Sequence, residues 1–158
     1  MWARPSQSTM TYMLMTGSDA IDAERAFTRS VRERRRAAIM RRLRRRPGDG
    51  GALPVYDERR LRGAAAARGI REVPIDAIAG TVEPSRATMF DACFRPAAAA
   101  RARWERVWLA EHRGQVMPPI SVAVAGDDRY VVRDGHHRVS VAKARGALTI
   151  DATLDGAV

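Results

Sequence analysis

The sequence predicts a small α+β domain with a mixed sheet, preceded by an arginine-rich N-terminal helix. Three observations support this fold class. Alternating apolar and polar residues recur in short runs, which is typical of strands. Longer stretches place apolar residues at helical spacing. The two kinds of segment follow one another as strand, loop, helix, hairpin, helix and strand, without any internal repeat.

The N-terminal helix is predicted over residues 19–46, because no proline or glycine interrupts this stretch. Either Ser18 or Asp19 can cap its first turn. We expect a disordered tail at 1–18 before the helix and a flexible linker at 47–55 after it.

Most of the positive charge lies in this helix, which has eleven arginines against four acidic residues. The pattern predicts either an electrostatic contact with nucleic acid or a solvated basic helix. A thin, interrupted apolar stripe suggests that the helix docks weakly or only with a partner; its members are Ile21, Phe27, Val31, Ile39 and Leu43. The candidate nucleic-acid-binding residues are Arg32, Arg34, Arg35, Arg36, Arg41, Arg42, Arg44, Arg45 and Arg46.

Composition excludes several classes of protein. The chain has 158 residues and a formal net charge of +10, which favours polyanionic partners such as DNA. No apolar run has the roughly 18 residues of a membrane span. A single cysteine, Cys93, excludes an internal disulfide framework. We therefore expect a cytoplasmic protein without a membrane partner.

The body of the protein is predicted to occupy residues 56–158. A helix is expected over 56–68, followed by a strand over 71–78 in which Pro74 favours a sheet edge or a strand entry. Residues 80–96 show no clear period and are expected to form a loop or a short helical excursion.

The second half of the body begins with a helix over 97–113, in which Trp104, Val107 and Trp108 fall at helical spacing and are expected to face the core. The elements after it are a hairpin of strands at 120–124 and 129–133, a helix at 136–145 and a strand at 148–154.

The most informative segment is the turn between the hairpin and the next helix, with the sequence Asp-Gly-His-His-Arg. The first turn of a helix offers free backbone N–H groups and a partial positive charge, and a glycine permits close approach of a ligand. Side-chain donors at the same place predict a phosphate-binding site. Its candidate residues are Asp134, Gly135, His136, His137 and Arg138.

The alternative is an ordinary helix start, with Asp134 as its N-cap and Arg138 on the surface. Adjacent histidines point about 100° apart on a helix, so they are not expected to share one role. Neither a cysteine nor a glutamate has metal-ligand spacing near them, so no zinc site is expected.

The runs Tyr130-Val-Val-Arg-Asp-Gly-His-His-Arg138, 139–146 and 150–154, with 119–122 before them, resemble the ParB N-terminal/sulfiredoxin superfamily. Residues 71–78 also look like its first strand. The resemblance covers roughly 71–154 and implies that the turn from Asp134 to Arg138 contacts the phosphates of CTP, ATP or ADP, with or without Mg²⁺.

The departures from the family pattern limit this implication. A histidine stands where sulfiredoxins have their catalytic cysteine, so sulfinic-acid reduction is not expected. The Glu-Arg-Arg form of partition proteins is also absent, and the turn is most similar to that of free-serine kinases. A kinase needs a carboxylate base, for which Glu83 and Asp91 are candidates by position only.

The favoured interpretation is a nucleotide-phosphate-binding module associated with DNA, either regulatory or similar to chromosome-partition proteins. The alternative is a nucleotide-dependent enzyme, either a small-molecule kinase or a nucleotide hydrolase. A nuclease is less favoured, because no carboxylate cluster suits two metal ions. Homodimerisation or a protein partner is left open.

Overall fold

The computed structural model describes residues 18–44, 51–61, 69–126 and 128–154. Its centre is a five-stranded mixed sheet with the strand order β1-β5-β3-β4-β2. The β1–β5 and β3–β4 pairs are antiparallel, whereas the β3–β5 and β2–β4 pairs are parallel. The α+β class and the mixed sheet are therefore confirmed. The strands are β1 (Ile70–Pro74), β2 (Ile78–Thr81), β3 (Ile120–Val124), β4 (Tyr130–Asp134) and β5 (Thr149–Leu154).

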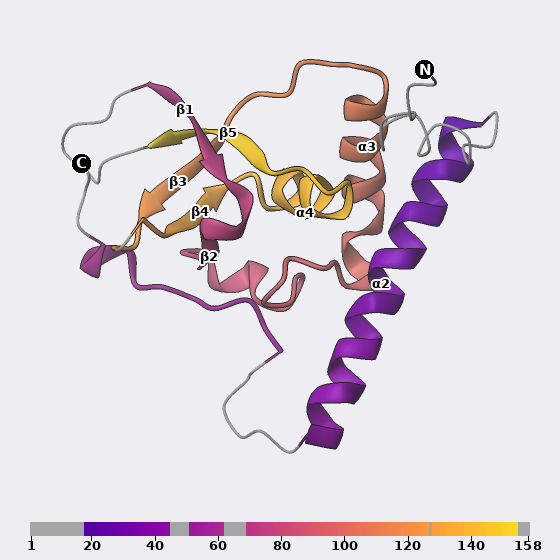
Figure 1. Ribbon diagram of the computed structural model, residues 1–158, viewed down its shortest axis with the longest axis horizontal. Helices are drawn as coiled ribbons and strands as arrows, with labels where there is room; N and C mark the ends of the chain where they lie inside the picture. Colours follow the sequence, from indigo (N-terminus) through magenta and orange to yellow (C-terminus); the bar gives the residue numbers. More distant parts are fainter. Residues whose placement is uncertain (1–17, 45–50, 62–68, 127, 155–158) are drawn as a thin grey trace, which may run out of the picture.

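Three α-helices stand beside the sheet in successive positions (Figure 1). They are α2 (Asp19–Arg44), α3 (Arg101–His112) and α4 (His136–Ala144). In Figure 1, α4 lies nearest the sheet, α2 lies on the far side of the molecule, and α3 lies between them. The sequence prediction of a long basic helix ahead of the α+β body is confirmed.

The main core lies between the sheet and α4. Alternation along β3 turns Ile120 and Val122 into this core, and Val132 of β4 joins them. Helix α4 contributes Val139 and Ala142, which lie three residues apart and so share one helix face. Burial of these apolar side chains fixes the start of α4 against the ends of β3 and β4.

The predicted strand at 71–78 is interrupted in the structure. Strand β1 ends at Pro74, a 3₁₀ turn covers Ile75–Ala77, and β2 begins at Ile78. The interruption has a topological cause, because β1 and β2 lie at opposite edges of the sheet and the chain must cross between them. The expectation that Pro74 marks a sheet edge is confirmed, since β1 is an edge strand.

The predicted helix at 56–68 is wrong in its described part. The Tyr56 N–H donates to the Thr81 carbonyl at 2.8 Å, so this residue is extended beside β2. Only Glu58–Arg60 turns, as a short 3₁₀ helix whose N-cap Asp57 accepts a hydrogen bond from a backbone N–H. Pairing with the edge of β2 therefore takes precedence over helix formation; residues 62–68 lie outside the described part.

The segment predicted as a linker, 47–55, lies partly in the described residues. There Leu53 is fully buried and its N–H donates to the Phe90 carbonyl at 3.2 Å. This stretch therefore contributes to the main core, while residues 47–50 and the tail predicted at 1–18 lie outside the description apart from Ser18.

Helix α2 packs firmly on α3, contrary to the expectation of weak docking. Phe27 meets Trp104 edge to face at 5.5 Å between ring centroids, and Ala23 and Trp108 complete a second buried cluster with Val141. The predicted stripe is confirmed only in its middle. Phe27 is buried and Val31 packs against the same cluster, with the small residues Ala23 and Ser30 completing the face, while Ile21, Ile39 and Leu43 are exposed.

No helix in the described residues combines the length and the apolar character that crossing a membrane requires.

Candidate functional site

A cavity of about 290 Å³ opens where β4 passes into α4. All five residues predicted to contact phosphate line it: Asp134, Gly135, His136, His137 and Arg138. The other lining residues come from three further segments of the chain: Arg86, Arg103, Val107, Met117 and Pro118. The fold thus converts a short sequence motif into one wall of a cavity.

Gly135 begins α4 with a left-handed backbone at φ 102°. A Cβ atom at this position would lie 2.5 Å from Cγ2 of Ile120, which no side chain tolerates. The sequence predicts that Gly135 permits a ligand to approach the backbone closely. In the structure, the side chain of Ile120 makes this close approach instead.

Asp134 is not the N-cap of α4, which corrects the sequence expectation. The N-cap is Gly135, without a side-chain hydrogen bond, and Asp134 is the last residue of β4. Its largely exposed carboxylate instead accepts a hydrogen bond from Arg138 Nη2 at 2.9 Å.

His136 is buried and engaged with the sheet. Its Nε2 lies 2.6 Å from the hydroxyl of Thr81, which also lies 3.3 Å from the Val132 carbonyl. Because a hydroxyl has one proton, it donates either to this carbonyl or to Nε2 of His136, and the tautomer of the imidazole determines which. Burial lowers the pKa of His136 to about 4, with a smaller contribution from Arg86, so its ring is neutral at physiological pH.

His137 is different, because its Nε2 is buried and has no hydrogen-bond partner among the described residues. The residue is only 5% exposed, and its ring meets Phe90 edge to face at 5.2 Å. Burial lowers its pKa to about 4, and the positive charges of Arg103 and Arg86 act in the same direction. An unpaired polar atom in such a place costs folding free energy, on the order of 1–3 kcal/mol.

Positive charge in the cavity comes from arginines rather than from the histidines. Arg103 is exposed on α3, and Arg86 ends the short 3₁₀ turn after β2. Arg138 is mostly enclosed and donates to the carbonyls of Pro118 and Pro119 as well as to Asp134. Its guanidinium thus fixes the segment that enters β3, and two arginines remain to face a ligand.

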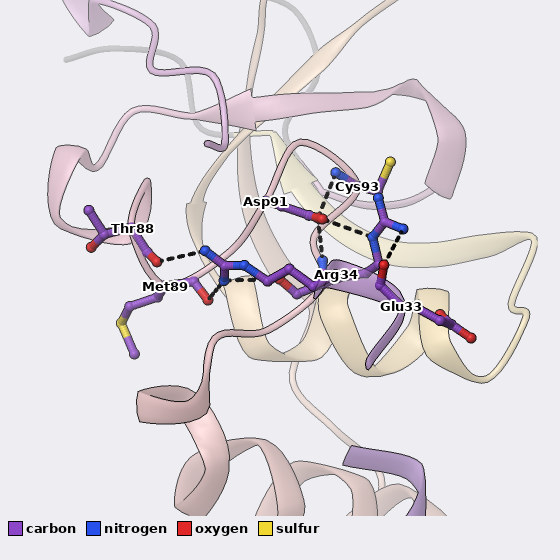
Figure 2. A network of polar contacts seen from close by, with 7 residues as sticks. Glu33, Arg34, Thr88, Met89, Asp91 and Cys93 are labelled. Carbon is purple, nitrogen blue, oxygen red and sulfur yellow. Dashed lines mark hydrogen bonds and ion pairs between the residues drawn. The ribbon is translucent and has the colours of Figure 1, made fainter. Parts of the chain in front are cut away.

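The loop that precedes α3 supports this cavity from behind. Phe90 is completely buried and lies against both histidine rings, stacked on His136 at 6.3 Å. Figure 2 shows how α2 holds the loop: Arg34 reaches from the helix and donates to the carbonyls of Thr88 and Met89, each at 3.1 Å.

A second arginine makes the reciprocal contact (Figure 2). Arg95 of the loop donates to the Glu33 carbonyl of α2 at 3.3 Å and pairs with the buried Asp91 carboxylate at 2.8 Å. Asp91 also accepts the N–H groups of Cys93 and Arg95. We call the contacts of Arg34 and Arg95 the arginine clasp.

The two carboxylates considered as catalytic bases differ in their surroundings. Asp91 is 1% exposed, and its oxygens are engaged by the clasp, so it does not face the cavity. Glu83 is exposed next to the 3₁₀ turn and does not line the cavity either. Within the described residues, no group of three or more His, Cys, Asp and Glu side chains is placed to hold a metal ion.

The arginines predicted to bind nucleic acid do not form a single surface. Arg32, Arg35, Arg36, Arg42 and Arg44 are exposed. Arg34 is engaged in the clasp, and burial lowers the pKa of its guanidinium while the Asp91 carboxylate opposes the change. Arg41 is half-buried, and Arg45 and Arg46 lie outside the described residues.

Sequence reasoning missed Arg86 and Arg103 as cavity residues. They lie in the loop after β2 and in α3, far along the chain from the turn, and only tertiary packing brings them to it. A signal was available for Arg103, since it lies next to Trp104 at the beginning of a helix whose buried face was predicted correctly.

Comparison with known proteins assigns neither a family nor an activity to the chain. No family model matches the chain, and no curated protein matches it. The crystal structure of sulfiredoxin from Arabidopsis thaliana is similar to 56% of this chain and 86% of that chain, with a TM-score of 0.41 and 20% sequence identity. A likeness this distant assigns neither a superfamily nor an activity.

Proposed function

We propose that the cavity at the start of α4 binds the phosphate groups of a nucleotide. The observation that carries the proposal is Nε2 of His137, a buried polar atom without a partner among the described residues, on a side chain that lines the same cavity as Arg86 and Arg103. Buried polar groups in native proteins nearly always have a partner, and a bound ligand is one way to supply it. An anion at this point accepts from Nε2 and from the free N–H groups of the first helical turn.

The chemistry of the donors favours phosphate over a cation. The lowered pKa values leave both imidazoles neutral at pH 7, so His137 contributes a hydrogen bond rather than a charge. Arg86 and Arg103 supply the charge, and a guanidinium pairs with two phosphate oxygens at once. The exposed carboxylate of Asp134 at the rim can meet a Mg²⁺ ion that arrives with the nucleotide.

The rest of the nucleotide has an apolar wall available in Val107 and Met117, which line the same cavity. CTP, ATP and ADP remain the candidate ligands. A binding module is favoured over a kinase or a hydrolase, because neither Asp91 nor Glu83 lines the cavity as a base, and the Asp134 carboxylate, which does line it, is paired with Arg138.

Calorimetric titration of CTP, ATP and ADP with Mg²⁺ tests the proposal. The sharpest variant is Arg103→Gln, which removes a charge from the cavity at an exposed position of α3. Arg106→Gln is its matched control, since Arg106 is exposed on the same helix and does not line the cavity.

We expect Arg103→Gln to weaken binding about tenfold or more, the value of a charge-assisted hydrogen bond, and Arg106→Gln to bind as the unaltered protein does. Absence of binding to the folded protein, or equal losses in both variants, contradicts the proposal. The nucleobase that the protein prefers distinguishes the two kinds of chemistry: partition-like proteins use CTP, and kinase-like proteins use ATP or ADP.

Association with DNA is a second candidate function. The net charge of +10 favours it, as does the exposure of most arginines along α2.

A further inference from the structure

One row of arginines on α2 is turned away from the rest of the molecule. Arg25, Arg29, Arg32 and Arg36 are all exposed, and their spacing of four, three and four residues keeps them within an arc of about 60° on the helix. We call these four residues the arginine row. Two of its members, Arg25 and Arg29, are not among the nucleic-acid-binding residues that the sequence predicted.

The row lies opposite the packing face of the same helix. Ala23, Phe27 and Ser30 are the buried residues of α2, and Arg34 of the clasp continues their line. At 100° per residue, this line is centred about 160° from the arginine row. Because α2 docks on α3 through its buried side, the arginine row on the opposite side is exposed to solvent.

The helix is held rigidly enough to display the row. Besides the aromatic contact of Phe27, Glu24 pairs with Arg101 at 2.8 Å and Asp19 pairs with Arg113 at 3.1 Å. These ion pairs connect α2 to α3 and to the residue after it. The row extends for about 16 Å along the helix axis, since eleven residues separate its ends.

The residues around the arginine row indicate which polyanion it suits: a single strand, a membrane surface or a duplex. Proteins that bind single strands stack bases on exposed aromatic side chains, whereas the aromatic residue of α2, Phe27, is buried. A helix that lies in a membrane surface needs a broad apolar face. Here the exposed large apolar residues of α2 stand at the ends of the row and not along it: Ile21, Ile39, Met40 and Leu43. Four arginines within one arc of α2, a helix whose own aromatic residue is buried, suit the phosphates of a duplex.

We propose that the arginine row is the surface that binds the phosphate backbone of duplex DNA, without reading its sequence. This proposal rests on the DNA association proposed above and names the surface that carries it. Contacts of this kind position a protein on DNA but do not select bases.

Fluorescence anisotropy with a short labelled duplex, measured across a salt series, tests the surface. The test variant replaces Arg25, Arg29, Arg32 and Arg36 with Gln. The matched control replaces four other exposed arginines with Gln: Arg59, Arg60, Arg71 and Arg129. Both variants lose the same net charge, so a difference between them reports where the charge lies.

We expect the slope of log affinity against log salt to fall by about 3 to 4 in the row variant and to change little in the control. Between about 50 and 200 mM salt, the unaltered protein should therefore lose about 100-fold more affinity than the row variant. Equal losses in both variants show that net charge alone binds DNA and overturn the proposal.

Tighter binding of a single strand than of the duplex also overturns it, as does a lack of duplex binding by the unaltered protein. Nucleotide titration of the same variants tests the cavity independently of DNA binding, because no residue of the arginine row lines the cavity.

Discussion

At His137, the stability of the fold and the proposed binding of phosphate make opposite demands on one residue. Its ring fills space beside Phe90, but its Nε2 has no partner among the described residues. A phenylalanine of similar volume would pack at this position without leaving a polar atom unpaired. The histidine is therefore better explained by a ligand than by packing, which supports the proposed function.

The two neighbouring histidines predict that stability depends on pH. Their folded pKa values of about 4 lie below the value of about 6.5 expected in the unfolded chain. Between these values the unfolded state binds more protons, so the free energy of unfolding rises with pH through this window and is flat above it. We expect acidification from pH 7 to 4 to cost on the order of 3 kcal/mol for each histidine.

Urea denaturation at a series of pH values measures this effect. The variant His137→Phe should lose about half of the pH dependence, keep or gain stability at pH 7, and bind nucleotide more weakly. A pH dependence that His137→Phe leaves intact would show that other groups cause it.

At the scale of elements, the arginine clasp connects α2 to the loop behind the cavity. Arg34 donates to three carbonyls, those of Thr88, Met89 and Arg95, and Arg95 returns a bond to the Glu33 carbonyl. The loop between them carries Phe90, which packs against both histidines. The helix that the sequence suggests is an appended arm thus takes part in supporting the site.

Replacing Arg34 with Ala should therefore destabilise the fold. It removes three hydrogen bonds made by a charged donor, although the Met89 and Arg95 carbonyls keep the N–H groups of Ala97 and Asp91 as donors, so we expect a loss of about 1–3 kcal/mol. Arg36→Ala removes the same charge two residues away on an exposed face and should change stability by less than about 0.5 kcal/mol. Chemical denaturation of the two variants side by side makes the comparison, and equal stabilities would show that the clasp contributes nothing.

Periodicity in the sequence was enough to predict elements that depend on their own residues. The hairpin of β3 and β4, the helix α4 and the strand β5 lie close to their predicted positions. Periodicity gave a wrong prediction where tertiary contacts determine the local structure. At Tyr56, for example, the backbone pairs with Thr81 and does not form a helix. The same limit applies to the site: the turn at 134–138 was recognisable, whereas Arg86 and Arg103 reach the cavity only through folding.

At the scale of the whole molecule, the charge pattern suggests a basic arm joined to a neutral body, but the buried surfaces do not follow this division. The second cluster takes Ala23 and Phe27 from α2, Trp104 and Trp108 from α3, and Val141 from α4. Trp104 also donates from Nε1 to the Ser140 hydroxyl at 2.9 Å, which connects α3 to the helix that begins at the cavity. Changes that disturb α2 should therefore also lower the stability of the α+β body.

Deleting residues 1–50 gives the clearest test of this continuity. The deletion uncovers Trp104, which is now completely buried, and removes the ring that packs on it at 5.5 Å. Losing a buried phenylalanine alone typically costs about 3–5 kcal/mol, a large fraction of the stability of a small domain. We expect a lower thermal midpoint and a red shift of tryptophan emission in the shortened chain. Phe27→Ala should reproduce both changes in the full chain, whereas an unchanged midpoint and emission spectrum would show that α2 is a separable arm.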